Sequence, residues 1–461
     1  MVFRGQDRDL RSLPSPQASF PTPLRGWGRE FKGRDTLVPS LKLTFMMPSL
    51  AYFFSAFPVL TETLALRQAR ATQRLGLPCV LAANRRPSPG QAHSQYKNDL
   101  PHTFYLTPVR LGTYLKTNVS ALVQSPRRYG EALSRAWRWR DRHPWQRWRN
   151  LAHLLGAAVL ADFLKKQAVC HVHVHFAYGA AEVALFLEAL SGIPYSLSIH
   201  GSDVLLENRL LEEKLRQARF IVSNCRYFVG YLIRRFPSLA SQRFYVVRGG
   251  VEMNDEAWRP ASFPETAGTL RLLNVARLAP VKAQDLLIEA LARLKVQEIP
   301  FACRIIGEGP LREDLESLVH ALGIQENVRF LGACQESEVR QQYDWSQVVV
   351  LSSRSEGTPM TIIEAMAKAR AFVAPRITAI PEMIEDGQSG LLFTPGSATD
   401  LARQLARLAS RPELLARMST EARRRGVELF ALTDNAKKFL AVLAREVPAL
   451  ELKPEVAVAP G

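Results

Sequence analysis

The sequence contains few cysteines, and they are scattered along the chain. The five are odd in number and include no C-x-x-C pair: Cys79, Cys170, Cys225, Cys303 and Cys334. Structural disulfides come in pairs and zinc sites need clustered thiolates, so this usage argues against a disulfide framework and a cysteine-based zinc site. It is typical of a protein that stays in the reducing cytoplasm.

Long apolar runs are missing as well. The longest uncharged run, residues 43–61, is interrupted by Pro48 and Pro58, and residues 151–164 are too few and include Asp162. A transmembrane helix needs about 20 consecutive apolar residues. Charged residues also crowd the first methionine, where a signal peptide would have its apolar core. We therefore expect a cytoplasmic protein whose contact with the inner face of the cytoplasmic membrane is peripheral.

What the chain has in excess is positive charge. It has 461 residues, with 60 lysines and arginines against 43 acidic residues, which gives a net charge of +17. The length favours two large domains, and 47% apolar with 22% charged residues is typical of a globular protein. A charge of this size suits nucleic acid, an anionic membrane surface or anionic substrates, and charge alone does not separate them.

The most unusual composition lies in residues 126–149. This stretch contains eight arginines and four tryptophans, opposed only by Glu131 and Asp141. Arginine binds phosphate as a planar fork, and tryptophan prefers the headgroup level of a bilayer. The pattern therefore favours a helix lying on an anionic membrane surface. The alternatives are a solvated helix with its tryptophans in the core and a helix that stacks on single-stranded nucleic acid.

The segment at residues 355–367 carries the clearest chemical pattern. It follows an apolar, strand-like run at residues 348–351. Gly357 allows tight backbone geometry, and Pro359 suits a first helical turn, where its missing N–H costs nothing. Apolar residues then recur at core-facing spacing, which predicts a helix over residues 360–369.

Two glutamates flank the start of that helix. Glu356 falls in the loop, and Glu364 falls about a turn and a half into the helix. The amino end of a helix offers free N–H groups and a positive dipole end, which suit a phosphate. Carboxylates only accept hydrogen bonds, which suits the hydroxyls of a sugar. A phosphate beside a polyol describes a sugar nucleotide, whereas the alternative is a capped core helix with two solvated glutamates.

This segment resembles the Glu-x7-Glu motif of retaining GT-B glycosyltransferases that use nucleotide-sugar donors (glycosyltransferase family 4, group 1 type). The resemblance implies an α/β protein with two Rossmann-like, doubly wound domains facing a cleft. It implies that Glu364 accepts from ribose hydroxyls and that Glu356, in the catalytic site, accepts from donor-sugar hydroxyls. It also implies further donor-binding positions in this segment: Gly357, Thr358, Pro359 and Met360.

The first half of the chain supports the same resemblance. Strands predicted over residues 50–56 and 79–83, joined by a helix over 64–75, indicate a parallel sheet whose ligands gather at the strands' carboxyl ends. Residues 57–63 resemble the Phe-Pro-x-Leu-Ser-Glu-Thr opening of exopolysaccharide glycosyltransferases of the colanic-acid type, with threonine in place of serine. A plain helix cap is the alternative to the acceptor-side contacts that this implies for three residues: Thr61, Glu62 and Thr63.

Histidines dominate the next strand. Alternation over residues 169–177 predicts that His171, His173 and His175 share one face. Three alternate histidines suit a metal, but no carboxylate or cysteine nearby in the sequence supports one. A strand end that points into a cleft explains them better. The segment resembles the His-x-His-Phe-Ala of the same family, which implies that His175 lies near the donor sugar in the catalytic site.

A strand predicted over residues 195–199 ends in His200 and, three residues later, Asp203. In an open α/β sheet, catalytic groups belong at such carboxyl ends. The spacing resembles the family's His-x-x-Asp, which implies a catalytic-site role for His200 and an acceptor-side role for Asp203. A structural histidine is the alternative.

The second half adds two cations. Arg277 and Lys282 lie on a loop after a strand predicted over residues 270–275, where two cations neutralise a diphosphate. A surface ion pair is the alternative. The pair resembles the family's Arg-Leu…Lys-Gly pattern, with Ala283 in place of glycine. The resemblance also places Gly307, in a glycine-rich turn, near the nucleotide.

The resemblance also bears on metals and domain boundaries. Asp-x-Asp, the usual metal anchor of the other main glycosyltransferase fold, occurs only at Asp7 and Asp9. We therefore expect no metal and no cofactor. The expected division is a disordered extension at 1–42, an acceptor-side domain at 43–258, a linker at 259–268, a donor-binding domain at 269–425, a helix crossing back at 426–447 and a tail at 448–461.

The expected function is that of a retaining, metal-independent hexosyltransferase. It would move a sugar from a UDP- or GDP-sugar to a glycan or lipid-linked acceptor in exopolysaccharide or lipopolysaccharide biosynthesis. A nucleotide-sugar epimerase with the same architecture is one alternative. A nucleic-acid-binding protein with an inactive site is another, and the ordered set of cations and glutamates argues against it.

Overall fold

The computed structural model describes residues 47–59, 63–88, 100, 102–139, 145–206, 208–260, 262 and 268–452. The chain divides into residues 1–45 and residues 46–461. Every element described below belongs to the second of these units. Thr61 and Glu62, two of the predicted acceptor-side residues, lie outside the described residues, as does the segment predicted to be disordered.

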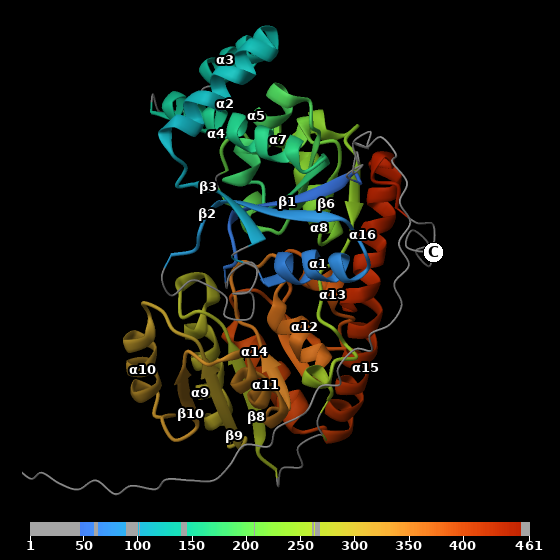
Figure 1. Ribbon diagram of the computed structural model, residues 1–461. Coiled ribbons are helices and arrows are strands. Elements are labelled where there is room, and N and C mark those ends of the chain that lie inside the picture. Colours follow the sequence, from blue (N-terminus) through green and yellow to red (C-terminus); the bar gives the residue numbers. More distant parts are fainter. Residues whose placement is uncertain are drawn as a thin grey trace, which may run out of the picture. The chain divides into compact units, whose positions relative to one another are not determined.

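Seven parallel strands of the described chain form a first sheet in the order β3-β2-β1-β4-β5-β6-β7. Figure 1 labels β1, β2, β3 and β6 of this sheet. The strand β1 pairs with β2 on one side and with β4 on the other, so the strand order reverses there. The bounds are β1 Ser49–Ala56, β2 Cys79–Arg85, β3 Thr103–Thr107, β4 Val169–His175, β5 Tyr195–Ile199, β6 Ile221–Ser223 and β7 Phe244–Val246.

Six parallel strands of the described chain form a second sheet in the order β10-β9-β8-β11-β12-β13. Here the order reverses at β8, which pairs with β9 and β11. The bounds are β8 Leu270–Val275, β9 Phe301–Ile306, β10 Val328–Gly332, β11 Val348–Val350, β12 Ala371–Pro375 and β13 Leu391–Phe393. Such reversals are where open α/β sheets bind ligands, beyond the carboxyl ends of their strands.

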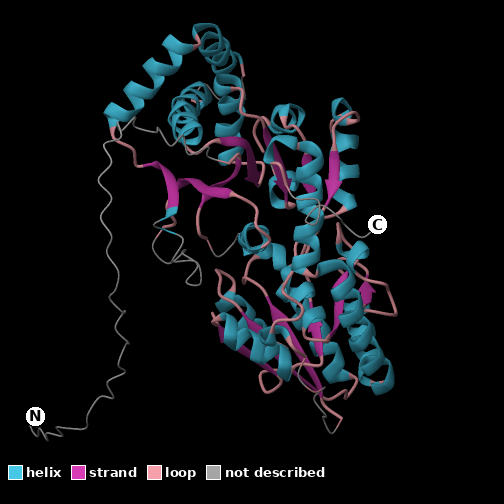
Figure 2. Cartoon of the chain, turned by 45° about the vertical axis from the view of Figure 1, so that its right-hand side comes forward, coloured by secondary structure: helices cyan, strands magenta, loops and turns pink. Residues whose placement is uncertain are grey.

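Helices accompany both sheets (Figures 1 and 2). Those of the first half are α1 Thr63–Arg74, α2 Leu111–Gln124, α3 Pro126–Arg138, α4 Gln146–Lys166, α5 Ala180–Ser191, α6 Ser202–Leu205, α7 Leu211–Gln217 and α8 Arg226–Arg235. Those of the second half are α9 Gln284–Val296, α10 Arg312–Ala321, α11 Glu336–Trp345, α12 Met360–Ala367, α13 Ile380–Met383, α14 Ala398–Ala409, α15 Pro412–Phe430 and α16 Leu432–Glu446.

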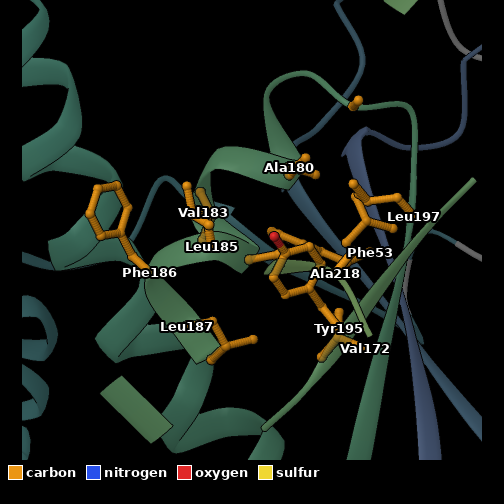
Figure 3. Close-up of a cluster of buried hydrophobic side chains, with 14 of the residues drawn as sticks. Phe53, Val172, Ala180, Val183, Leu185, Phe186, Leu187, Tyr195, Leu197 and Ala218 are labelled. Atoms are coloured by element: carbon orange, nitrogen blue, oxygen red, sulfur yellow. The ribbon is translucent and has the colours of Figure 1, made fainter. Parts of the chain in front are cut away.

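The core of the first half forms around α5. This helix is apolar on almost every side, which is the pattern of a fully buried helix. Figure 3 shows Val183, Phe186 and Leu187 of α5 in one cluster with Phe53 of β1 and Leu197 of β5. The last helix, α16, contributes Phe439, Leu440 and Leu443 to a second cluster that contains the β1 residues Leu50, Tyr52 and Phe54.

Two Rossmann-like, doubly wound parallel sheets confirm the fold class predicted from the sequence. No helix of the described chain is long and apolar enough to span a membrane.

Candidate active site

Loops from the two sheets meet through backbone at the predicted site. A Cβ on Gly357 would lie 2.2 Å from the carbonyl oxygen of His200, and one on Gly201 would lie 2.5 Å from the Cα of Gly357. These distances leave no room for a side chain at either glycine. The loop after β5 and the loop after β11 are therefore in direct contact, which brings His200 to the Glu356 segment.

Glu356 is buried, and one oxygen of its carboxylate has two partners. The Nζ of Lys282 lies 2.7 Å from its Oε1, and the Ser353 hydroxyl donates to the same oxygen. The Thr378 hydroxyl donates to the Glu356 carbonyl over 2.8 Å. The carboxylate and the ammonium are thus fixed together at the carboxyl ends of β8 and β11, although 74 positions separate them in the chain. This is an ion pair with one buried partner at a loop junction, not a solvated surface pair.

The helix α12 begins beside this pair. Pro359 is its N-cap and Met360 its first residue, so the proline stands one position before the predicted first turn. A proline side chain has no hydrogen-bond acceptor, so the N–H groups at the start of α12 receive no side-chain cap. The Thr361 hydroxyl donates to the Val275 carbonyl over 3.1 Å and ties α12 to β8. Within the described chain, the Thr358 hydroxyl oxygen is buried without a hydrogen-bond partner.

Glu364 lies farther along α12 and faces two residues that the sequence did not single out. The Tyr343 hydroxyl donates to Glu364 Oε2 over 3.1 Å, and Arg67 of α1 lies 3.8 Å from Oε1. Burial raises the pKa of Glu364, and Arg67 and Tyr343 oppose that rise. Arg67 also lies 3.5 Å from Glu336. A first-half cation therefore contacts the predicted ribose-binding carboxylate.

Arg277 is exposed on the loop after β8, and its guanidinium forms no ion pair within the described chain. The turn after β9 packs against this loop and needs a glycine at position 307. Gly307 has a φ of +137°, and a Cβ there would lie 2.0 Å from the Ala276 carbonyl oxygen. Ala283, which stands where the family has glycine, has a φ of +48° at the N-cap of α9. The left-handed backbone at this position explains why glycine suits it.

The three histidines of β4 are core residues, and two of them form a buried polar column with serines of β5. The Ser196 hydroxyl lies 2.8 Å from both His171 Nε2 and His173 Nδ1, and the Ser198 hydroxyl lies 2.9 Å from His173 Nε2. The three histidines do share one face, as alternation predicted. They do not point into open space, because all three side chains are completely buried among aromatic rings.

The last histidine of β4 contacts the loop residue predicted with it. His175 Nδ1 lies 3.2 Å from His200 Nε2, and Asn224 Nδ2 lies 2.9 Å from His200 Nδ1. Burial lowers the pKa of both histidines, that of His200 to about 3, so both are neutral at pH 7. His175 has an exposed fraction of 0% and His200 of 9%. The His175 side chain therefore lies behind that of His200, farther from solvent.

Asp203 serves the loop that carries His200. Its carboxylate accepts from the backbone N–H groups of Ala177, His200 and Gly201 over 2.8, 3.0 and 2.9 Å. Burial raises its pKa, and these hydrogen bonds oppose the rise. The side chain thus fixes the loop rather than facing open space.

Thr63, another predicted acceptor-side residue, is the first residue of α1.

Glu382 is a further residue of interest that sequence reasoning missed. Its carboxylate accepts from the backbone N–H groups of Arg226 and Tyr227 over 2.9 and 2.6 Å, and Arg248 lies 3.6 Å away. Glu382 belongs to α13 of the second half and therefore caps the amino end of α8, a helix of the first half. A signal that could have found it is the sequence Pro-Glu-Met-Ile at residues 381–384, which resembles a Pro-Glu-x-Ile pattern of the same family.

Two doubly wound sheets whose carboxyl-end loops meet define the class: this is the GT-B fold. Comparison with known proteins bears this out. The chain is similar to HepE from Anabaena, whose crystal structure holds UDP, with a TM-score of 0.63 over 87% of this chain and 100% of that one. Their identity is 16%, so this likeness concerns the fold.

Residues 259–425 match the model of the family described as "Glycosyl transferases group 1". A putative colanic acid biosynthesis glycosyltransferase, WcaL of Salmonella typhimurium, is 25% identical over 77% of this chain and 89% of its own length. WcaL of Escherichia coli is 33% identical over 36% of this chain and 42% of its own length. The family resemblance inferred from the motifs is thereby confirmed, and nothing in these comparisons favours the epimerase alternative.

Proposed function

We propose that the protein transfers a sugar from a UDP- or GDP-sugar to a glycan or lipid-linked acceptor in the biosynthesis of a cell-surface polysaccharide. The match to group 1 glycosyltransferases and to relatives named for colanic acid biosynthesis supports this proposal. One observation carries the proposal: the Lys282–Glu356 pair lies just before the amino end of α12, and the loop that carries His200 contacts the neighbouring Gly357. A cation, a carboxylate and uncapped helix amides in one place suit a sugar diphosphate.

The donor's diphosphate would lie between the two cations of the second half and the start of α12. The Arg277 guanidinium is exposed, and Lys282 is held in place by Glu356. These cations and the first amides of α12 would stabilise the negative charge that grows on the leaving phosphate. They would do so in place of a metal ion, which makes the reaction metal-independent. Glu364, beside Tyr343, would accept hydrogen bonds from the ribose hydroxyls.

The transferred sugar would face Glu356 and His200. Glu356 would accept from sugar hydroxyls, and His200, neutral at pH 7, would act as a hydrogen-bonding group held in place by His175 and Asn224. The acceptor hydroxyl oxygen would attack the anomeric carbon from the side of the departing phosphate. The bond from that carbon to the phosphate oxygen breaks, and the hydroxyl proton passes to the phosphate. The product then retains the donor's anomeric configuration.

The acceptor would approach from the first half. The loop held by Asp203 and the start of α1 at Thr63 are the described parts of that side. Thr61 and Glu62 remain predicted acceptor-side residues. The exposed tryptophans within residues 126–149 support a location at the inner face of the cytoplasmic membrane, where the protein would act as a peripheral protein.

A transfer assay tests the proposal. Purified protein is incubated with UDP- and GDP-hexoses and a cell lipid extract, with EDTA or with Mg²⁺, and release of UDP or GDP is measured. We expect release in EDTA that depends on the extract, and a loss of at least about a hundredfold in Glu356→Gln, where the amide no longer pairs with Lys282. Proton NMR of the product gives the anomeric configuration. Release only with Mg²⁺, or an inverted product, would overturn the corresponding part of the proposal.

A further inference from the structure

The helix α2 buries polar side chains and exposes apolar ones. Its buried residues are Thr117 and Asn118. The side-chain amide of Asn118 donates to the carbonyls of Tyr114 and Leu155 over 2.8 and 3.1 Å. Five apolar side chains of α2 have exposed fractions of 46–75%: Leu111, Leu115, Val119, Leu122 and Val123. Helical spacing puts these five on one stripe. A stripe of this kind in water signals an interaction surface.

A second apolar feature lies between α3 and α4. A cavity of about 600 Å³ is lined by Leu133, Ala136, Trp137, Trp148 and Leu151, with Arg138 and Arg147 at its margin. The Arg147 guanidinium lies over the Trp137 ring at 4.7 Å. Trp137, Trp145 and Trp148 are 56%, 76% and 61% exposed. The alternative weighed for this stretch, a helix with its tryptophans in the core, therefore describes Trp139, which packs on Phe186, but not these three.

The charges around these features are almost all positive. Four arginines on α3 and the start of α4 are exposed: Arg127, Arg128, Arg138 and Arg149. Among the described residues 110–139 and 145–151, Glu131 is the single acid, and Arg127 pairs with it at 3.2 Å. Exposed apolar side chains with exposed guanidinium groups beside them match an anionic lipid surface.

We propose that this lipid face, defined as the α2 stripe, the α3–α4 cavity and the exposed tryptophans beside it, docks into an anionic membrane. The stripe enters the acyl region, the cavity takes one acyl chain, and the arginines contact the phosphates. This surface is separate from the donor site, so membrane docking can be tested independently of the proposed sugar transfer. It extends the sequence prediction, which covered only residues 126–149.

Two other occupants fit the surface less well. Nucleic acid would use the arginines and tryptophans but would leave the α2 stripe in water. A second copy of the chain would bring two basic faces together, and like charges at close range oppose association.

Vesicle co-flotation with the full-length protein tests the lipid face. We expect binding to vesicles of phosphatidylcholine with 30 mol% phosphatidylglycerol, about tenfold weaker binding to phosphatidylcholine alone, and partial retention in 0.5 M NaCl. Leu115→Asp combined with Val119→Asp should reduce binding at least tenfold. Val296→Asp is the matched control, because Val296 is 84% exposed on α9, away from this surface, and should bind like the wild type.

Tryptophan quenching separates insertion from adsorption. Phosphatidylglycerol brominated along its acyl chain should quench the fluorescence of the bound protein. Replacing Trp137, Trp145 and Trp148 together by phenylalanine should remove most of that quenching. Equal binding of the aspartate variant and the wild type would overturn the proposal. So would binding without quenching, a dimer that the aspartate variant abolishes, or displacement of the protein from vesicles by single-stranded RNA.

Discussion

Glycines set how closely the loops of the candidate site approach one another. Gly201 and Gly357 let the two halves touch through backbone, and Gly307 lets the turn after β9 lie against the loop that carries Arg277. At each position a Cβ would fall at 2.5 Å or less from another residue's backbone. The cations and carboxylates are therefore positioned by residues that contribute no chemistry of their own.

The substitution Gly307→Ala tests this at the level of one residue. A methyl group there meets both a positive φ and the Ala276 carbonyl, whereas a methyl group at Gly323, with a φ of +65°, would have no atom within 4 Å. Gly323→Ala should cost about 1 kcal/mol of unfolding free energy through backbone strain alone, and Gly307→Ala clearly more. Urea unfolding measures both. Equal losses in the two variants would mean that the turn after β9 has room to move.

At the scale of elements, one capping interaction joins the two halves. Glu382 of α13 caps α8 with two backbone N–H bonds. A carboxylate at a helix amino end is favourable for both hydrogen bonding and the helix dipole. Because α8 follows β6 and α13 follows β12, this contact helps to hold the loops of the two sheets against each other.

We expect Glu382→Ala to lower the unfolding free energy by about 1–3 kcal/mol and to raise the donor KM more than it lowers kcat. The lost cap frees the two halves, and the donor would bind where they meet. Ser397→Ala is the control, because Ser397 caps α14 within the second half. It should lower stability while leaving KM unchanged. A donor KM that shifts equally in the two variants would show that the Glu382 cap has no special role in closure.

Local patterns were enough to predict the elements that carry the site. The apolar run before Gly357, the helix after Pro359 and the alternation around His173 each depend on neighbours in sequence, and the structure has them as β11, α12 and β4. The resemblance to the family then implied a common site for His200 and Glu356, and the loops that carry these residues are in contact.

What the sequence did not predict depends on distant partners. Glu382 caps a helix 156 positions away, and Arg67 reaches Glu364 from α1. Neither contact produces a periodic pattern in the sequence from which it could be predicted. The α2 stripe has the spacing of a core-facing helix, so its outward orientation follows only from the polar contacts of Asn118. The role of Asp203 was hidden for a related reason: a carboxylate that binds backbone amides looks, in sequence, like one that binds a ligand.

At the scale of the whole molecule, the buried histidines of β4 and of the loop after β5 link stability to pH. Burial lowers the pKa of His171 and of His200 from 6.5 to about 3. As pH falls below 6.5 the unfolded chain therefore takes up protons before the folded one does. This contribution to the unfolding free energy is complete above pH 6.5 and is lost progressively as pH falls toward 3.

Between pH 7 and pH 5 we expect a loss of about 2 kcal/mol for each of these two histidines. Urea unfolding across this range measures the loss. His171→Phe removes one titrating group and should reduce the pH dependence by about one histidine's share. Stability that does not vary between pH 7 and pH 5 would mean that these histidines are accessible to protons in the folded state.

The central claim, that the second half binds a nucleoside diphosphate through Lys282 without a metal ion, is tested most directly by calorimetric titration with UDP and GDP in EDTA. We predict that the wild type binds one of the two, that Lys282→Ala binds it about tenfold to a hundredfold more weakly, and that Arg293→Ala binds it unchanged. Arg293 is the control because it is an exposed cation on α9, in the same half. Absence of binding to either nucleotide, or equal binding by Lys282→Ala and the wild type, would contradict the account.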